Sequence, residues 1–145
     1  MTDKINKKLG EILVDYGMIT NQQLEKALKL QKEYNKRIGQ VLIDSHFTNQ
    51  DQINWVLGKQ LDIPYIHVEL DQIDAELIKK FPEYLMKNYW LIPIIEINEK
   101  LVVAMADPTD EEAIQKLKSF CKKEVELTLA SFQNITEIIQ DIENG

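Results

Sequence analysis

Two copies of one residue pattern stand in the first sixty residues, and they carry the side chains best suited to hold a ligand. The first copy, residues 8–31, reads KLGEILVDYGMITNQQLEKALKLQ, and the second, residues 37–60, reads RIGQVLIDSHFTNQDQINWVLGKQ. Each copy offers a basic residue, a glycine, aliphatic residues at helical spacing and a closing glutamine. Two similar half-sites on one short segment predict a ligand that itself has two similar halves.

The residue types in each copy suit a phosphate linked to a purine. A cation and a glycine at the start of a helix can hold an anion, because the first backbone amides have no helical partner and a ligand can approach them closely. The aliphatic stripe could form a flat apolar wall, and the glutamine adds a donor group and an acceptor. In the second copy Arg37 could also stack on a base or bind its edge with two hydrogen bonds.

Core packing is the alternative explanation for part of this pattern. Aliphatic residues at helical spacing are usually buried between helices, and a glycine near a helix start can simply allow two helices to approach. The repeated basic residue, glycine and glutamine are the part that core packing does not explain. Both readings of the stripe stay open at this point.

Each copy predicts a helical hairpin. Residues 9–16 have helical spacing, and Gly17 follows in the position where a left-handed residue often ends a helix. Thr20 and Gln23 form a capping-box pattern that starts the next helix. In the second copy we predict Thr48 as the cap, with Asp51 at the third helical position. Four short helices are therefore expected in this half.

The pattern changes after Leu61, where Pro64 disfavours helical geometry at the residue before it. Aliphatic and β-branched runs predict strands, and helical spacing predicts helices between them. The expected strands are residues 65–68, 91–97, 101–105 and 124–130, with a hairpin at residues 98–100, and the expected helices are residues 74–80, 82–89, 111–120 and 132–142. The predicted fold is α+β: a four-helix tandem-repeat subdomain over residues 1–61, packed on a small α+β subdomain over residues 62–145 with about three strands.

Charge and composition limit the partners. Residues 1–60 hold nine Lys/Arg and seven Asp/Glu, a net charge of +2, whereas residues 61–145 hold eight and seventeen, a net charge of −9. This balance opposes binding to DNA, and the alternative of a helix-turn-helix protein is further weakened because residues 21–31 and 49–60 carry few basic side chains. No apolar run reaches the roughly 20 residues of a membrane span, and the single cysteine, Cys121, cannot form a disulfide framework. We expect a cytoplasmic protein without nucleic-acid partners or direct membrane insertion.

Motifs of catalysis do not occur in this sequence. It contains neither GxxxxGK[ST] nor GxGxxG nor HExxH, and its two histidines have no cysteine partners at zinc spacing. The acidic residues around Asp110 could bind a cation, but helix capping is the more usual role of such a cluster. The sequence therefore predicts a non-enzymatic protein without a metal site or a resident cofactor.

The doubled frame resembles the MshEN domain, the N-terminal domain of assembly ATPases for type IV pili and type II secretion. That family has a tandem 24-residue motif, RLGxxL, ten residues and then LxxxLxxQ, with a five-residue spacer. In this chain the spacer is residues 32–36, KEYNK. The segments LDIPYIHVELDQID, IPI and VVAMADPTD in the second half are also similar to such domains.

The resemblance implies a cyclic di-GMP receptor. It implies that the leucines lie against the guanine faces and ribose, and that Arg37 and Gln60 meet base edges or phosphate. Carried over position by position, the ligand-binding residues are Lys8, Leu9, Gly10, Leu13, Leu24, Leu28 and Gln31 in the first copy, and Arg37, Ile38, Gly39, Leu42, Ile53, Leu57 and Gln60 in the second.

Departures from the family pattern bear on function. Lys8 stands where the family has arginine, and lysine keeps the charge but lacks the planar fork, so binding in the first half-site is expected to be either weakened or lost. The protein partner implied is an assembly ATPase motor domain or a membrane-platform protein, reached either as a regulatory segment of a larger ATPase or as a stand-alone sensor. The alternative function is a protein docking module that binds no nucleotide.

Overall fold

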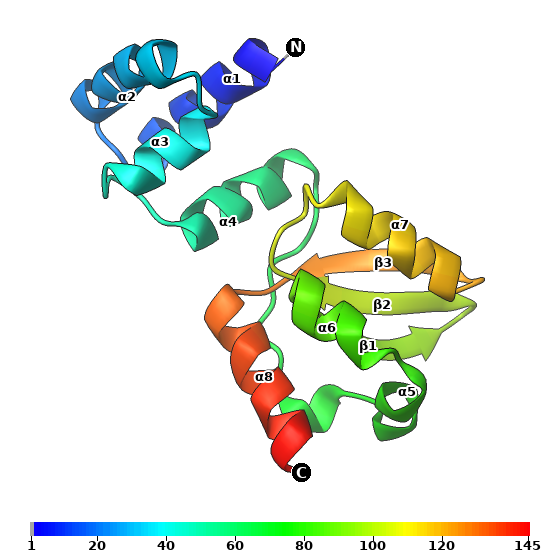
Figure 1. Cartoon of the computed structure of the whole chain (residues 1–145). Helices are drawn as coiled ribbons and strands as arrows, with labels where there is room; N and C mark the ends of the chain where they lie inside the picture. The colour runs from blue at the N-terminus through cyan, green and yellow to red at the C-terminus, as the bar shows by residue number, and fades with distance from the viewer. Residues whose placement is uncertain (1) are drawn as a thin grey trace. The chain divides into compact units, whose positions relative to one another are not determined.

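A computed structural model describes the backbone of residues 2–145 and the side chains from residue 9 onward. Its contacts divide the chain into two compact units, residues 1–57, called the helical unit here, and residues 58–145, called the α+β unit (Figure 1). The sequence-based division after residue 61 remains a prediction.

The helical unit is built from short helices, as the sequence predicts. They are α1 (Thr2–Asp15), α2 (Asn21–Tyr34), α3 (Ile38–Asp44) and α4 (Gln50–Gln60), the last turn of which belongs to the α+β unit. The apolar sides of these helices meet in one hydrophobic core that combines residues of both sequence copies. Burial of these aliphatic side chains holds the hairpins of the two copies together, because each hairpin alone is too small to cover its apolar face.

The repeat is visible in the backbone as well as in the sequence. Gly17 and His46 both have left-handed geometry, with φ of 73° and 62°, at the end of the first helix of each copy. The amides of Met18 and Phe47 each donate to the carbonyl five residues earlier, at 2.9 and 3.0 Å. This is the Schellman arrangement that closes a helix, and it occurs at the same place in both copies.

Both copies also start their second helix with a side-chain cap. Thr20 Oγ1 accepts from the Gln23 amide at 3.1 Å while Gln23 Oε1 accepts from the Thr20 amide at 2.9 Å, so the predicted capping box is confirmed. In the second copy the cap is Asn49, whose Oδ1 accepts from the Gln52 amide at 2.9 Å. The prediction of Thr48 was wrong, because Asn49 is the residue in register with Thr20 and caps equally well.

The two copies differ at their first helix. Sequence reasoning starts that helix at Leu9, but α1 begins at Thr2, so Gly10 lies in a helix interior and Lys8 is not at a helix start. The helical spacing continues backwards through Ile5, four residues before Leu9, and no breaker interrupts it. The prediction of a first-turn glycine was therefore wrong for the first copy.

The second copy has the predicted arrangement at this position. Asn35 adopts left-handed geometry, with φ of 53°, and ends α2. Arg37 is then the N-cap residue of α3, and Gly39 lies in the first turn. Only this copy therefore presents a basic residue beside the unpaired amides of a helix start.

The α+β unit contains a three-stranded sheet in the order β1-β2-β3. Strands β1 (Leu91–Ile97) and β2 (Lys100–Met105) form the predicted antiparallel hairpin, closed by Asn98 and Glu99 with φ of 52° and 64°. Strand β3 (Glu124–Leu129) is parallel to β2, and α7 (Glu111–Phe120) supplies the crossover. The α+β class predicted for the chain is confirmed.

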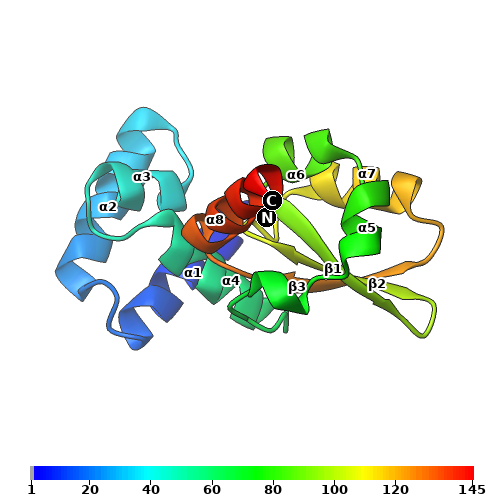
Figure 2. The ribbon, with the colours of Figure 1, turned by 90° about the horizontal axis from the view of Figure 1, so that it is seen from below.

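The remaining helices of this unit cover the sheet and its hairpin. They are the short 3₁₀ helix η1 (Leu70–Gln72) and helices α5 (Ala75–Lys80), α6 (Glu83–Tyr89) and α8 (Phe132–Asn144). Helices α6 and α7 lie side by side against the sheet, and α8 contacts β1 and η1 (Figures 1 and 2). Their buried faces form a second hydrophobic core.

One predicted strand does not form. Residues 65–68 make a single isolated bridge, between Tyr65 and Leu129. Further along this segment the backbone pairs with a side chain: the Val68 amide donates to Asn134 Oδ1 at 2.7 Å, and Asn134 Nδ2 donates to the Val68 carbonyl at 3.0 Å. Because the buried carboxamide of Asn134 replaces a neighbouring strand here, the strand prediction was wrong.

Candidate functional site

The repeated glycines let helices of the same copy approach each other. A Cβ on Gly10 would lie 2.4 Å from Leu24 Cδ1, and a Cβ on Gly39 would lie 3.3 Å from Ile53 Cδ1. Leu24 and Ile53 occupy the same position in the two copies, so the same pair of positions is in contact twice. Both glycines therefore allow close packing of two helices, which is the alternative explanation for their repetition. Contact of either glycine with a ligand remains a prediction.

Most of the aliphatic residues predicted to contact a ligand lie in the helical core. Their side chains are 0–8% exposed and belong to one hydrophobic cluster. They are Leu9, Leu13, Leu24, Ile38, Leu42 and Ile53. The structure thus brings the two copies together through these residues, and their direct effect is to fix the positions of the four helices.

A smaller part of the predicted set is accessible. Leu28, Gln31, Gly39 and Leu57 are half-buried, and Arg37 is exposed. Gln60 is also exposed but falls in the α+β unit, and Lys8 lies in α1 with its side chain outside the described residues. Among the described side chains of the helical unit, a ligand can therefore meet the predicted set at these five positions.

Arg37 lies at the N-terminal end of α3. Its backbone is extended, with φ of −68° and ψ of 145°, and its carbonyl accepts from the Val41 amide at 3.1 Å, which anchors the start of α3. No side-chain capping bond engages it, and among the described side chains none pairs with its guanidinium. Among the side chains of residues 9–145, the guanidinium of Arg37 is therefore exposed and unpaired.

The adjacent cation, Lys36, already forms an ion pair within the unit. Lys36 Nζ lies 3.3 Å from Asp44 Oδ2, and Gln40 Nε2 donates to Asp44 Oδ1 at 2.8 Å. The hydrogen bond from Gln40, followed by that from Lys36, lowers the pKa of the Asp44 carboxyl below its ordinary value of 3.8. Lys36 and Arg37 are therefore neighbours with different roles, which makes Lys36 a matched control for Arg37.

A small pocket near this ion pair was missed by sequence reasoning. It has a volume of about 190 Å³ and lies between α2 and α3, lined by Leu30, Tyr34, Lys36, Val41, Asp44 and Ser45. Comparing the copies could have indicated it, because Ser45 stands where the first copy has the much larger Tyr16. Tyr16 instead packs against Trp55 in an edge-to-face arrangement, with ring centroids 4.8 Å apart.

The acidic cluster of the α+β unit caps turns and helices. Asp110 Oδ1 accepts from the Ala113 amide at 3.1 Å at the start of α7, and Asp107 Oδ1 accepts from the Thr109 amide at 2.9 Å. Within the described residues, no group of three or more His, Cys, Asp or Glu side chains could hold a metal ion. In the same part of the chain, no helix is both long and apolar enough to cross a membrane.

Comparison with family models gives a match to the MshEN domain over residues 61–145, which is more than half of the chain. The chain belongs to the MshEN domain family. The matched region is the second half of the sequence, whereas the doubled frame lies before it, so the family is supported by residues other than those of the tandem motif. The predicted resemblance is thereby confirmed.

The chain is also similar to curated proteins of greater length. It is 30% identical over 133 residues to the type IV pilus assembly ATPase PilB of Myxococcus xanthus, and 26% identical over 111 residues to the bacteriophage adsorption protein B of Escherichia coli K12. These alignments cover 92% and 77% of this chain but 24% and 15% of those proteins. This MshEN chain therefore spans at most about a quarter of the relatives it matches.

Solved structures share its fold. A structure of MshE with cdg (cyclic di-GMP) matches with a TM-score of 0.73 and 28% identity, covering 92% of this MshEN chain and 97% of the other. The N-terminal domain of XpsE matches with a TM-score of 0.68 and 17% identity, covering 92% of both chains. The second likeness concerns the fold alone.

Proposed function

We propose that this chain is a cyclic di-GMP-binding regulatory domain that controls a type IV pilus or type II secretion assembly ATPase, or a similar output partner. The observation that carries the proposal is the similarity, over nearly the whole length of both chains, to the structure of MshE with cdg. The doubled motif supports it, because a ligand with two guanines and two phosphates matches two similar half-sites on one segment.

In this proposal the predicted site has two kinds of residue. The buried aliphatic residues hold the helices in place, and the accessible ones contact the nucleotide. Arg37 supplies the charge and the planar fork for a phosphate or a guanine edge, and Gln31 supplies hydrogen bonds. Leu28 and Leu57 offer their half-buried faces to a base or a ribose. Lys8 and Gln60 complete the set at its two ends.

The domain itself performs no catalysis in this proposal. The ATPase named among its relatives is a far longer protein, of which this chain matches 24%. The nucleotide signal is therefore passed from a cytoplasmic receptor domain to a motor domain or another protein. Direct docking without nucleotide is the competing function, and the same titration distinguishes the two.

The test is isothermal titration of the chain with cyclic di-GMP, with cyclic di-AMP and GTP as controls. We expect binding of cyclic di-GMP alone, at one ligand per chain. Arg37→Ala is expected to weaken binding by about tenfold or more, which corresponds to roughly 1.4 kcal/mol, without loss of helical circular dichroism. Lys36→Ala removes the same charge one residue away, from a side chain that already pairs with Asp44, and is expected to leave the affinity within about threefold.

Two outcomes would contradict the proposal. If the wild-type chain binds none of the three nucleotides and Lys8→Arg does not restore binding, the receptor function is wrong. If Arg37→Ala and Lys36→Ala bind as well as the wild type, the site has been assigned to the wrong residues. A gain in affinity from Lys8→Arg alone would show that the first half-site limits the binding.

A further inference from the structure

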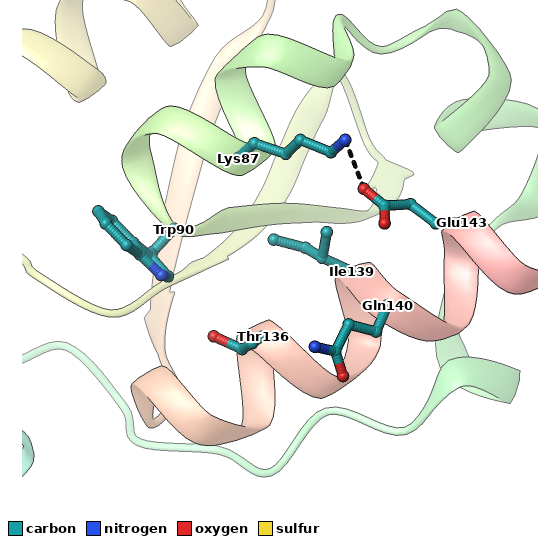
Figure 3. A pocket seen from close by; sticks show the side chains of 6 residues that line it. All are labelled: Lys87, Trp90, Thr136, Ile139, Gln140 and Glu143. Carbon is teal, nitrogen blue, oxygen red and sulfur yellow. Dashed lines mark ion pairs between the residues drawn. The ribbon is translucent and has the colours of Figure 1, made fainter.

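A second pocket lies within the α+β unit, and none of its lining residues is assigned to the nucleotide. It has a volume of about 210 Å³ and is formed by the end of α6 and one face of α8. Figure 3 shows the side chain of Ile139 pointing across this space toward the indole of Trp90, with polar side chains around them. The lining residues are Lys87, Trp90, Thr136, Ile139, Gln140 and Glu143.

Trp90 occupies a position that rarely holds a bulky side chain. It ends α6 in left-handed geometry, with φ of 47° and ψ of 62°, where glycine or asparagine is usual. Its amide donates to the Met86 carbonyl and its own carbonyl accepts from the Ala106 amide at 3.1 Å, so the backbone is held on both sides. The indole and the ring of Phe132 meet in an edge-to-face arrangement with centroids 5.7 Å apart, yet Trp90 is 44% exposed. The backbone of Trp90 is thus held in an unfavourable conformation while its ring is presented to solvent. Residues held in such conformations cluster at binding sites, and an exposed indole offers a large apolar surface to a partner.

The two helices that form the pocket are acidic, whereas the pocket lining itself holds one basic and one acidic side chain, Lys87 and Glu143. Helices α6 and α8 together carry four acidic residues and one basic residue, a net charge of −3. The basic residue, Lys87, lies 2.5 Å from Glu143 Oε1 and 3.0 Å from Glu83 Oε1. The hydrogen bond to Glu143, followed by that to Glu83, raises the pKa of Lys87. Lys87 therefore already pairs with Glu143, the acidic residue of the pocket lining.

We propose that this pocket docks a basic segment of a partner protein, with an arginine guanidinium stacked on Trp90 and paired with Glu143 in place of Lys87. A guanidinium over an exposed indole gains a cation–π interaction, and its fork can bind a carboxylate with two hydrogen bonds. The carbonyl of Gln140 and the hydroxyl of Thr136 can accept its remaining hydrogens. The negative charge of the two helices attracts such a segment and disfavours an acidic one.

The probe is a short acetylated and amidated peptide of alternating arginine and leucine, and the control peptide has glutamine in place of each arginine. Both are titrated into the ¹⁵N-labelled chain, and the indole resonance of Trp90 and the side-chain amide of Gln140 are followed. We expect both resonances to shift with the arginine peptide only. Equal shifts with the glutamine peptide, or shifts confined to residues 1–57, would overturn the proposal.

Variants separate docking from folding. Trp90→Gly removes the ring and suits the left-handed backbone, so the unit is expected to stay folded while binding falls about tenfold. Tyr84→Ala removes an aromatic ring from the same helix that is 55% exposed and does not line the pocket, and it should not change binding. Lys87→Met should tighten binding severalfold, because Glu143 loses its internal cation.

The effect of Lys87→Met on binding distinguishes most clearly between a docking role and a purely structural role of Lys87. If Lys87 merely supported the fold, Lys87→Met would weaken binding or leave it unchanged, and either result would refute the assignment of Glu143 to the partner arginine. Because this pocket and the nucleotide residues of the helical unit are tested with different probes, failure of one proposal leaves the other standing.

Discussion

Substituting Gly10 by alanine tests how tightly the first helical hairpin is packed. An added Cβ would lie 2.4 Å from Leu24 Cδ1, more than 1 Å inside the ordinary separation of about 3.5–4.0 Å between carbon atoms. Overpacking of a core typically costs about 1–3 kcal/mol. Alanine in a helix interior recovers about 0.8–1.0 kcal/mol relative to glycine. We therefore expect Gly10→Ala to destabilise the helical unit by about 1 kcal/mol.

The matched variant is Gly39→Ala in the second copy. Its Cβ would lie 3.3 Å from Ile53 Cδ1, which requires a shift of only a few tenths of an ångström. We expect a change in unfolding free energy of less than about 0.5 kcal/mol, since the small clash and the gain in helix propensity nearly cancel. Gly39→Ala also separates packing from ligand contact: a loss of cyclic di-GMP affinity at unchanged stability would place the nucleotide against this glycine.

The assay is urea unfolding in a Trp90→Phe background, which leaves Trp55 as the sole tryptophan and a reporter of the helical unit. A double-mutant cycle with Leu24→Val, which lacks the Cδ atoms, should give a coupling energy of about 1 kcal/mol with Gly10→Ala. The equivalent cycle of Gly39→Ala with Ile53→Val should give less than about 0.5 kcal/mol. If Gly10→Ala stabilises the unit and shows no coupling to Leu24→Val, the reasoning from this contact is refuted.

Three further predictions concern single side chains. Asn134→Ala should destabilise the α+β unit by about 2–4 kcal/mol in urea unfolding, because it leaves a buried backbone amide and carbonyl unpaired; an effect below about 1 kcal/mol would contradict this. Asn49→Ala should cost about 1 kcal/mol and Thr48→Ala less, and the reverse order would return the cap to Thr48. Asp44 should titrate below 3.8 by NMR, and Gln40→Ala should raise its pKa; since the folded pKa is lowered, its contribution to stability is present above 3.8 and is lost as the pH falls through the folded value.

The sequence predicted elements whose cause is local. The capping box at Thr20, the glycine that ends α1 and the hairpin between β1 and β2 all follow from a few neighbouring residues. The hairpin formed at Asn98-Glu99 although this pair is a weaker turn sequence than Asn-Gly, because both residues accept positive φ here. Local chemistry was sufficient at each of these places.

The wrong predictions have a different origin. In the segment 65–68 the backbone of Val68 pairs with the side chain of Asn134, which lies 66 residues further on and which no local pattern identifies. The predicted start of the first helix at Leu9 was wrong because the repeat begins inside α1, and the helical spacing continues back to Ile5. No sequence pattern identifies Trp90, since its significance depends on its backbone conformation and on the α8 residues that line the same pocket.

The candidate site contains residues that could touch a ligand and residues that hold the helices in place, and burial distinguishes the two kinds. A repeated motif shows which positions matter, but it does not distinguish a residue that touches the ligand from one that holds such a residue in place. In this chain Leu13 and Leu42 are fully buried at equivalent positions, whereas Arg37 is exposed at a helix start. Removing either leucine would damage the core that aligns α1 and α3, and affinity would fall together with stability. Only at an accessible position such as Arg37 can affinity fall while the fold stays intact, so only there does a binding measurement report direct contact.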